Sequence, residues 1–317
     1  MPEPTLTICH PIGGPTLHAD TPSNQTACLV RIYPADGACG LWNLDKTEKV
    51  YLGRGFDCDI HIEDEAASRR HAAIKTDSQG DLLLDLKSTN GTYLNDALVK
   101  QKRLKAGDRI RIGSHVFKYL SSDSIEVQYH ETVFRMTTRD GLTQTFNKQY
   151  LTEFLERELS RSQQRGRPIS VAMLDLDLFK QVNDKHGHLA GDEVLRELCE
   201  RATGVLNAGD ILARYGGEEF CAVFCESDET EARQLAESIR ETIAASPFRT
   251  MSGLIPVTTS IGVATWNGLG GELSLRAVLQ AADDQLYKAK KAGRNQISWT
   301  GVQVPRSSNT DTTVEPK

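Results

Sequence analysis

The chain has 317 residues, of which 39% are hydrophobic and 25% are charged, and its formal net charge at pH 7 is −6. This length allows two ordinary domains with separate cores, and the negative charge excludes a general electrostatic footprint for nucleic acid. No apolar run reaches the roughly 18–20 residues that span a bilayer, the start of the chain lacks a secretory signal, and the seven cysteines form no C-x-x-C pair. We therefore expect a cytoplasmic protein with reduced thiols, no nucleic-acid partner and no membrane anchor.

The residue pattern of the first part of the chain predicts an N-terminal tail followed by an all-β domain. Residues 1–27 are rich in Pro, Gly and Thr without periodicity, which predicts a flexible tail. Over residues 28–120, short apolar segments alternate with turn signals such as Asp36-Gly37 and Asn90-Gly91, a pattern that predicts a β-sandwich. The expected strands are Leu29–Tyr33, Ile60–Ile62, Ala72–Ile74, Leu82–Leu86, Ile110–Ile112 and Val116–Tyr119.

Residues 121–138 predict a helix that links this domain to the rest of the chain. Asp123 and Glu126 resemble a capping pair, and an apolar stripe follows at helical spacing. The stripe packs either on the chain's own domains or on a second chain, and both alternatives remain open. Its members are Ile125, Tyr129, Val133 and Met136.

Residues 139–300 alternate between helical and strand patterns, which predicts an α/β domain with a central sheet. The tail that follows Trp299, with expected bounds 301–317, is polar and is expected to be disordered. The expected helices are 150–164, 191–206, 232–243 and 275–291, and the expected strands are 169–174, 211–214, 220–224 and 257–263.

Two groups of carboxylates in this second domain point to a metal site. Gly216-Gly217 predicts a tight turn between two strands, with Glu218 and Glu219 at its tip, although such a hairpin alone is equally consistent with a plain surface turn. Asp175-Leu176-Asp177 continues a buried strand, where clustered anions repel each other unless a cation compensates. Oxygen ligands with no His or Cys nearby favour Mg²⁺ or Mn²⁺.

The order and spacing of the motifs resemble the GGDEF-domain diguanylate cyclases. The resemblance extends from about Arg139 to Trp299 and implies a fold similar to nucleotidyl cyclases and polymerase palms. It also implies the condensation of two GTP molecules into cyclic di-GMP. The matching segments are Asp140–Thr143, Asp175–Lys180, Asn183-Asp184, Gly187-His188, Gly191-Asp192, Gly216–Phe220 and Lys290–Asn295.

The same resemblance implies a role for each site residue. Asp175, Glu219 and the carbonyl of Leu176 would hold the metal, two Mg²⁺ or Mn²⁺ ions per GTP site, and Glu218 would either activate the 3′-hydroxyl or hold the second ion. One GTP per domain implies a homodimer. The substrate-binding residues would be Asn183 and Asp192 for guanine, and Phe179, Lys180, Lys290 and Arg294 for the triphosphate, with Arg214 reaching a phosphate across the dimer.

Two features of this half bear on specificity and feedback. A carboxylate at Asp192 accepts from N1–H and the amine of guanine, so it disfavours a hybrid cyclase that takes ATP. Many family members carry an Arg-x-x-Asp product site before the signature, but this chain has Asn207-Ala208-Gly209-Asp210. Without the arginine, bidentate contacts are lost, which predicts weak or absent product inhibition.

In the β-rich half, the motifs resemble a forkhead-associated (FHA) domain over residues 28–120. The resemblance implies phosphothreonine binding by Arg54 and Ser68 with Thr89 beside them, whereas Arg69 and Asn90 would hold the peptide backbone. A threonine of the chain's own tails is one candidate ligand and an external peptide is another. The matching segments are Gly53-Arg54, Ser68–His71 and Ser88–Asn95, with Gly53 and His71 expected to be architectural.

The sequence therefore predicts a multidomain protein in which an all-β, FHA-like sandwich is joined by a helix to an α/β, palm-like GGDEF domain. Every catalytic position of the family is filled by a competent residue, which favours a diguanylate cyclase regulated by phosphopeptide binding. The alternative is a non-catalytic phosphopeptide adaptor whose second domain only binds nucleotide.

Overall fold

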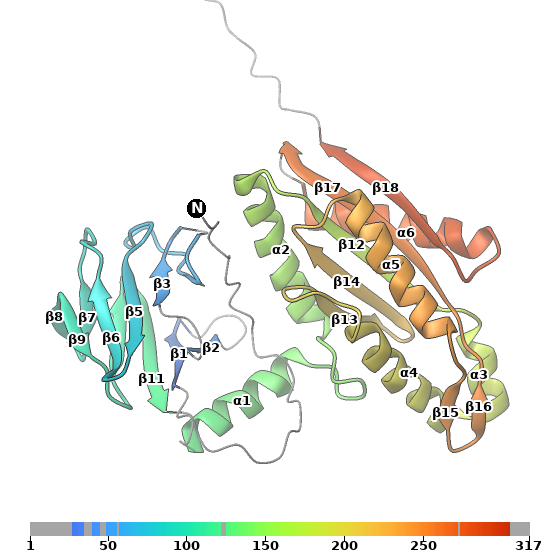
Figure 1. Ribbon diagram of the computed structural model, residues 1–317, viewed down its shortest axis with the longest axis horizontal. Helices are drawn as coiled ribbons and strands as arrows, with labels where there is room; N and C mark the ends of the chain where they lie inside the picture. The colour runs from blue at the N-terminus through green and yellow to red at the C-terminus, as the bar shows by residue number, and fades with distance from the viewer. Residues whose placement is uncertain are drawn as a thin grey trace, which may run out of the picture. The chain divides into compact units, whose positions relative to one another are not determined.

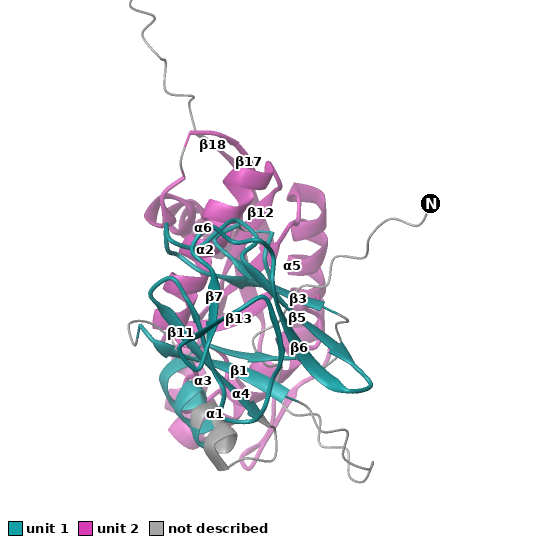
Figure 2. Ribbon diagram, turned by 90° about the vertical axis from the view of Figure 1, so that its left-hand side faces the viewer, with its two compact units in different colours: residues 1–138 teal, residues 139–317 magenta. Residues whose placement is uncertain are grey.

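The computed structural model describes residues 27–34, 40–44, 49–55, 57–121, 125–271 and 273–304. The chain divides into two compact units, residues 1–138 and 139–317 (Figure 2). The predicted tails outside these ranges, the Asp36-Gly37 turn and the Asp123 cap lie outside the described residues. No helix in the described part of the chain is long and apolar enough to cross a membrane.

The first unit is the predicted β-sandwich, so the expected architecture is confirmed. Its core lies between the two sheets, where Leu29 and Phe117 of one sheet and Leu52, Ile74 and Leu83 of the other are buried. One sheet has the order β2 (Leu41–Asn43), β1 (Ala27–Tyr33), β11 (His115–Ser121), β10 (Arg109–Ile112), β7 (Thr92–Leu94), β8 (Ala97–Val99). The other has the order β4 (Ile60–His61), β3 (Lys49–Gly53), β5 (Ala72–Asp77), β6 (Gly80–Asp85), β9 (Gln101–Arg103).

Helix α1 (Ile125–Thr138) occupies the predicted linker and contacts β2 and β11 of its own unit. The predicted apolar stripe is wrong in part, because Tyr129 and Met136 are 65% and 77% exposed. Phe134 and Thr138 are buried instead. The buried side of the helix is therefore rotated away from the side that apolar spacing alone indicates.

The second unit is built on a five-stranded sheet with β12 (Ile169–Leu176) at its centre (Figure 1). All eight positions of β12 are buried, so the strand is covered on both faces. It pairs antiparallel with β14 (Glu219–Cys225) and β17 (Thr259–Gly270), while β13 (Ile211–Gly216) and β18 (Ile297–Val304) form the two edges.

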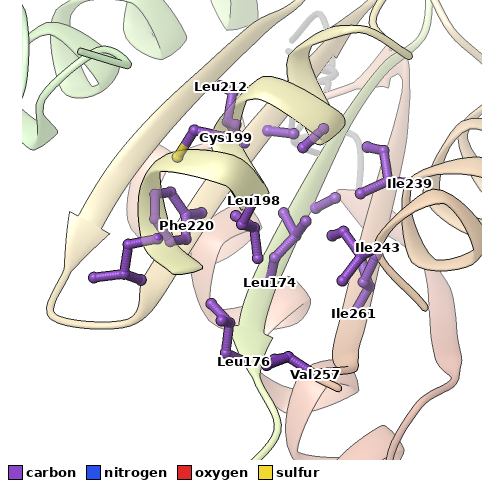
Figure 3. Close-up of a cluster of buried hydrophobic side chains, with 14 of the residues drawn as sticks. Leu174, Leu176, Leu198, Cys199, Leu212, Phe220, Ile239, Ile243, Val257 and Ile261 are labelled. Atoms are coloured by element: carbon purple, nitrogen blue, oxygen red, sulfur yellow. The ribbon is translucent and has the colours of Figure 1, made fainter. Parts of the chain in front are cut away.

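Helices cover both faces of this sheet. Helices α4 (His188–Thr203) and α5 (Glu229–Ala244) pack on one face, in a core that includes Leu174, Leu198, Phe220 and Ile239 (Figure 3). Helices α2 (Lys148–Arg165) and α6 (Leu275–Lys291) pack on the other face, α6 so closely that a Cβ at Gly262 would lie 2.0 Å from the Leu286 nitrogen.

Some elements of the second unit are not predicted by the sequence patterns. Helix α3 (Phe179–His186) and the hairpin of β15 (Phe248–Thr250) and β16 (Gly253–Ile255) are too short to show a period. The expected disorder after Trp299 is wrong for the first residues of that tail, because β18 runs to Val304 in parallel pairing with β17. An edge strand exposes one side, so its sequence carries little apolar signal.

Candidate functional site

The carboxylates of the second unit meet where β12 and β14 end. Asp175 on β12 is the cross-strand partner of Glu219 on β14. Cross-strand partners direct their side chains to the same face of a sheet, here the face that α6 covers. Asp175 is buried and Glu219 is half-buried, so the two carboxylates predicted to share a metal are brought together at one end of the sheet.

The turn that carries Glu218 and Glu219 is held by Arg214. Gly217 adopts a left-handed φ of 48°, which a glycine takes at little cost. The Arg214 guanidinium donates from Nε and Nη2 to the Gly217 carbonyl, at 2.9 and 2.7 Å, and from Nη1 to Asp140 Oδ1 at 3.0 Å. In this structure the predicted phosphate ligand is thus engaged within its own unit and braces the turn.

Asp140 anchors the other side of this brace. Its Oδ1 also accepts from the backbone nitrogen and hydroxyl of Thr143, at 2.9 and 2.8 Å. Burial raises the pKa of Asp140, but the hydrogen bonds from Thr143 and Arg214 outweigh burial and leave the pKa below its ordinary value. Sequence reasoning used Asp140 only to mark where the second domain begins, and the structure shows that it supports the signature turn.

Lys290, on the last turn of α6, lies on Asp175. Its Nζ is 2.8 Å from Asp175 Oδ2. Burial raises the pKa of Asp175, and the hydrogen bond and charge of Lys290 oppose that shift without cancelling it. The pKa of Glu218 is also raised, by burial first and then by the charge of Asp175, with Lys290 acting in the opposite direction.

Asp177 organises the loop beside these carboxylates. It follows the buried strand β12, and the structure shows it buried. It accepts from the hydroxyls of Thr258 and Ser260, at 2.7 Å each, and from the Asn295 nitrogen at 3.0 Å. The last contact fixes the turn after α6, where Arg294 has a left-handed φ of 65° and an exposed side chain.

The two predicted guanine ligands lie at the junction of α3 and α4. Asn183 is on α3 and Asp192 is on α4, and both side chains are half-buried. Gly191 makes room for the amide, because a Cβ there would lie 2.0 Å from Asn183 Oδ1. The glycine before Asp192 therefore allows the asparagine to lie against the start of α4.

The start of α3 presents backbone N–H donors close to the C-terminal end of β12, which carries Asp175. Leu178 precedes the helix with a left-handed φ of 59° and makes no side-chain capping bond. The first N–H groups of a helix have no acceptor within the helix and favour anions. The amides of Phe179 and Lys180 occupy these positions, as the phosphate-binding prediction requires.

The oxygen donors at this edge fit a hard divalent cation. Asp175, Glu218 and Glu219 supply carboxylates, and Leu176 ends β12 opposite Thr259. Mg²⁺ prefers such oxygens and completes its shell with substrate phosphates. Within the described residues, no group of three or more His, Cys, Asp or Glu side chains is placed to hold a metal ion by itself.

A second candidate site lies at the loop end of the sandwich. Gly53 allows the loop before β5 to approach, since a Cβ there would lie 2.3 Å from the Arg69 carbonyl oxygen. The Arg54 nitrogen donates to the Ser68 carbonyl at 3.0 Å, and the Thr89 nitrogen donates to Ser68 Oγ at 3.0 Å. The hydroxyls of Ser68 and Thr89 are thus adjacent, at 3.4 Å, while Arg54 and Arg69 are exposed.

His71 joins the two loops of this site. Its Nδ1 accepts from the Ser68 nitrogen at 3.0 Å, which leaves Nε2 to donate to the Gly91 carbonyl at 3.1 Å. Burial lowers the pKa of His71, consistent with this neutral arrangement. Asn90 is held by its own amide, which donates to the Ala66 carbonyl at 2.8 Å. The predicted phosphopeptide residues therefore converge on one edge.

The segment that departs from the expected product site is folded back on itself. Asp210 accepts from the Asn207 nitrogen at 3.0 Å and from the Cys225 nitrogen at 2.9 Å. Burial raises the pKa of Asp210 to about 6, against these hydrogen bonds. The carboxylate thus serves the chain's own backbone at the point where β13 begins.

Both halves of the chain match known protein families. The family model "Diguanylate cyclase, GGDEF domain" matches residues 137–296, and the FHA domain model matches residues 50–113. The response regulator PleD of Caulobacter vibrioides is 38% identical over 164 residues, or 51% of this chain and 36% of PleD. Diguanylate cyclase DosC of Escherichia coli is 35% identical over 173 residues, or 54% of this chain and 36% of DosC.

A solved structure of a GGDEF domain is also similar to this chain. The coiled coil and GGDEF domain of DgcB from Caulobacter crescentus, in complex with c-di-GMP, is 30% identical with a TM-score of 0.51, covering 55% of this chain and 92% of that one. The similarity to PleD and DosC is confined to part of each protein, since the matched segment spans 36% of their length.

Proposed function

The chain belongs to the family of diguanylate cyclases with a GGDEF domain, and from that premise we propose that it makes cyclic di-GMP and pyrophosphate from two GTP molecules, under the control of its FHA domain. The observation that carries the proposal is that Asp175 of β12 and Glu219 of β14 are cross-strand partners, with Lys290 of α6 in contact with Asp175. Acidic metal ligands and a phosphate-binding cation are thus gathered at one edge.

The residues divide the chemistry between them. Lys290 and Arg294 neutralise the triphosphate and the departing pyrophosphate, and the amides of Phe179 and Lys180 add uncharged donors. When bound to Asp175, Glu219 and the Leu176 carbonyl, a divalent cation supplies Lewis acidity toward the phosphates. Glu218, whose pKa burial raises, is suited to accept the proton of the attacking 3′-hydroxyl or to hold a second ion.

Guanine selection is assigned to Asn183 and Asp192. A carboxylate at Asp192 accepts two donors from guanine, whereas adenine presents an acceptor at N1 and leaves the half-buried charge without a partner. Gly191 leaves room for the Asn183 amide, because a Cβ there would lie 2.0 Å from Asn183 Oδ1. We expect discrimination against ATP to reside in these two side chains.

Two reciprocal phosphodiester bonds require two GTP molecules held face to face. Each second unit contains one set of carboxylates and one set of phosphate-binding residues, so the reaction needs a homodimer. Bringing two loaded half-sites into register is chiefly an entropic task, which a regulatory domain is able to perform.

Regulation is assigned to the sandwich. A phosphothreonine carries a dianionic phosphate, and Arg54, Ser68 and Thr89 offer a guanidinium and two hydroxyls at one edge. Arg69 and Asn90 would hold the peptide backbone beside it. The peptide is either a phosphorylated threonine of the chain's own tails or a segment of another protein.

The first test is chromatography of the nucleotides after incubation of the full chain with GTP and Mg²⁺. We expect cyclic di-GMP from the wild type, none from Glu219→Ala, and wild-type amounts from Glu200→Ala, which removes an exposed carboxylate of α4. Equal product from the wild type and Glu219→Ala would refute the metal site.

The test has a second arm for the sandwich. Absence of product from the wild type with and without phosphothreonine peptide would refute the cyclase and leave a nucleotide-binding adaptor. Product that appears only with peptide, and not in Ser68→Ala, would support both halves of the proposal.

A further inference from the structure

One ion pair in the second unit joins two residues to which the proposed function gives different partners. Lys290 Nζ lies 2.8 Å from Asp175 Oδ2. Asp175 is assigned to the divalent cation, and Lys290 is assigned to the triphosphate. The cation proposed to bind phosphate therefore lies on the anion proposed to bind the metal ion.

The contact differs from an ordinary surface salt bridge. The Asp175 side chain is 9% exposed and the Lys290 side chain is 33% exposed. Charges shielded from water interact strongly, and an unpaired buried carboxylate is costly. The position of Lys290 is also set by the fold, because α6 lies against Gly262 with no space for a Cβ.

The charge of Lys290 acts on more than one carboxylate. The pKa of Glu218 is raised by burial and by the charge of Asp175, and Lys290 lowers it. Glu219 adds another negative charge as the strand partner of Asp175. A single ammonium group thus acts on the carboxylates to which the proposed function assigns the metal ion.

We propose that Lys290 is an exchangeable counter-ion, which neutralises Asp175 in the empty site and moves to the triphosphate when the divalent cation takes its place. This inference rests on the proposed function. A divalent ion arriving alone meets the repulsion of the ammonium group, which then needs an anion other than the carboxylates that the ion itself occupies. Nucleotide phosphates supply that anion, so the metal and GTP bind with positive coupling, and the coupling resides in Lys290.

The experiment measures Mn²⁺ binding to the full chain without nucleotide, from the electron paramagnetic resonance signal of free Mn²⁺. Lys290→Met and Lys290→Gln are expected to bind Mn²⁺ about tenfold more tightly than the wild type, a coupling of ordinary size. Lys291→Met is the matched control, because the Lys291 ammonium group lies over the Tyr287 ring at 4.4 Å, and it should bind Mn²⁺ like the wild type.

Repeating the titration with a non-hydrolysable GTP analogue tests the exchange itself. The analogue should tighten Mn²⁺ binding by about tenfold in the wild type and Lys291→Met, and by much less in either Lys290 variant. Unchanged or weaker Mn²⁺ binding in both Lys290 variants, together with loss of binding in Asp175→Asn, would overturn the exchange and leave the metal site intact. Unchanged binding in Asp175→Asn would overturn the exchange and the metal site together.

Discussion

Two polar side chains near the carboxylates of the second unit, Asp177 and Arg214, form hydrogen bonds with other groups of the chain itself. Asp177 accepts hydrogen bonds from Thr258, Ser260 and Asn295, and Arg214 donates to both Gly217 and Asp140. Buried polar groups need such partners, because leaving one unpaired costs about 1–3 kcal/mol. These residues hold the loops that carry the site, which is a role that residue type alone does not distinguish from contact with substrate.

Arg214 provides a test of that distinction. If it acts by bracing the turn, Arg214→Lys and Asp140→Asn should each lower the rate of cyclic di-GMP formation by about tenfold or more, and the double variant should be no slower than the worse single variant. The measurement is a double-mutant cycle on kcat, with circular dichroism to check folding. A large loss in Arg214→Lys beside wild-type activity in Asp140→Asn would favour direct contact with a phosphate.

Asp210 gives a pH-dependent contribution to stability. Its pKa is raised from 3.8 to about 6 in the folded chain, chiefly by burial. The folded state therefore holds the proton more tightly than the unfolded state, so this contribution is complete below about pH 4 and is lost as the pH rises through 6. We expect Asp210→Asn to remove a fall of about 2 kcal/mol in the free energy of unfolding over that interval.

The measurement is urea unfolding of the full chain at several values between pH 4 and 7.5. Asp283→Asn, which changes an exposed carboxylate of α6, should keep the wild-type slope. The same slope in Asp210→Asn as in the wild type would contradict the assignment.

Because the Asp210 carboxylate is bonded to the backbone of Asn207 and Cys225, we also expect cyclic di-GMP to inhibit the enzyme weakly through this segment.

At the scale of elements, the site depends on how closely α6 packs on β17. A Cβ at Gly262 would lie 2.0 Å from the Leu286 nitrogen and 2.2 Å from the Ala282 oxygen, both on the helix backbone. Backbone atoms cannot turn aside as a flexible side chain does. A larger residue would therefore displace the whole helix, and Lys290 with it.

Gly262→Ala should lower the free energy of unfolding by about 1–3 kcal/mol, the usual cost of overpacking, and should reduce GTP affinity through Lys290. Chemical denaturation and equilibrium binding measure the two effects. The control is Gly204→Ala at the end of α4, where a Cβ would meet its nearest neighbours at an ordinary 3.5 and 3.6 Å. That change should alter stability by less than about 1 kcal/mol. Equal stability of the two variants would contradict the packing argument.

The sequence predicted elements well where burial imposes a pattern. Helix α6 has the predicted bounds, because its apolar side repeats at helical spacing against β17, and β12 reads as a continuous apolar run because both its faces are covered. Helix α3 and the β15–β16 hairpin carry no such pattern, since they are short and largely exposed. The sequence also placed Asp175, Asn183 and Lys290 in one site through motif spacing, but not the bond between Lys290 and Asp175, which depends on three-dimensional packing.

At the scale of the whole molecule, one chain contains an FHA domain, proposed to bind a phosphopeptide, and a GGDEF domain, proposed to form one half-site for GTP. In the proposed reaction each second unit supplies one Asp175–Glu219 pair, so one chain would hold one GTP and would not complete two reciprocal bonds alone. Activity should therefore depend on the meeting of two chains. Phosphopeptide binding at Ser68 and Arg54 would then control cyclase activity by changing how often, or how well, two chains align.

The dependence on pairing predicts that cyclic di-GMP formed per mole of enzyme rises in proportion to protein concentration when the dimer is dilute, and levels off when dimers are saturated. The measurement is the initial rate over a wide range of enzyme concentration at saturating GTP and Mg²⁺. Adding excess Glu219→Ala protein should lower the rate per mole of wild type, because mixed dimers lack one of the two metal sites. The Glu200→Ala protein, added as a control, should raise the total rate as wild type does. A specific activity independent of concentration and unaffected by Glu219→Ala would mean that one chain completes both bonds, and it would contradict the proposed homodimer.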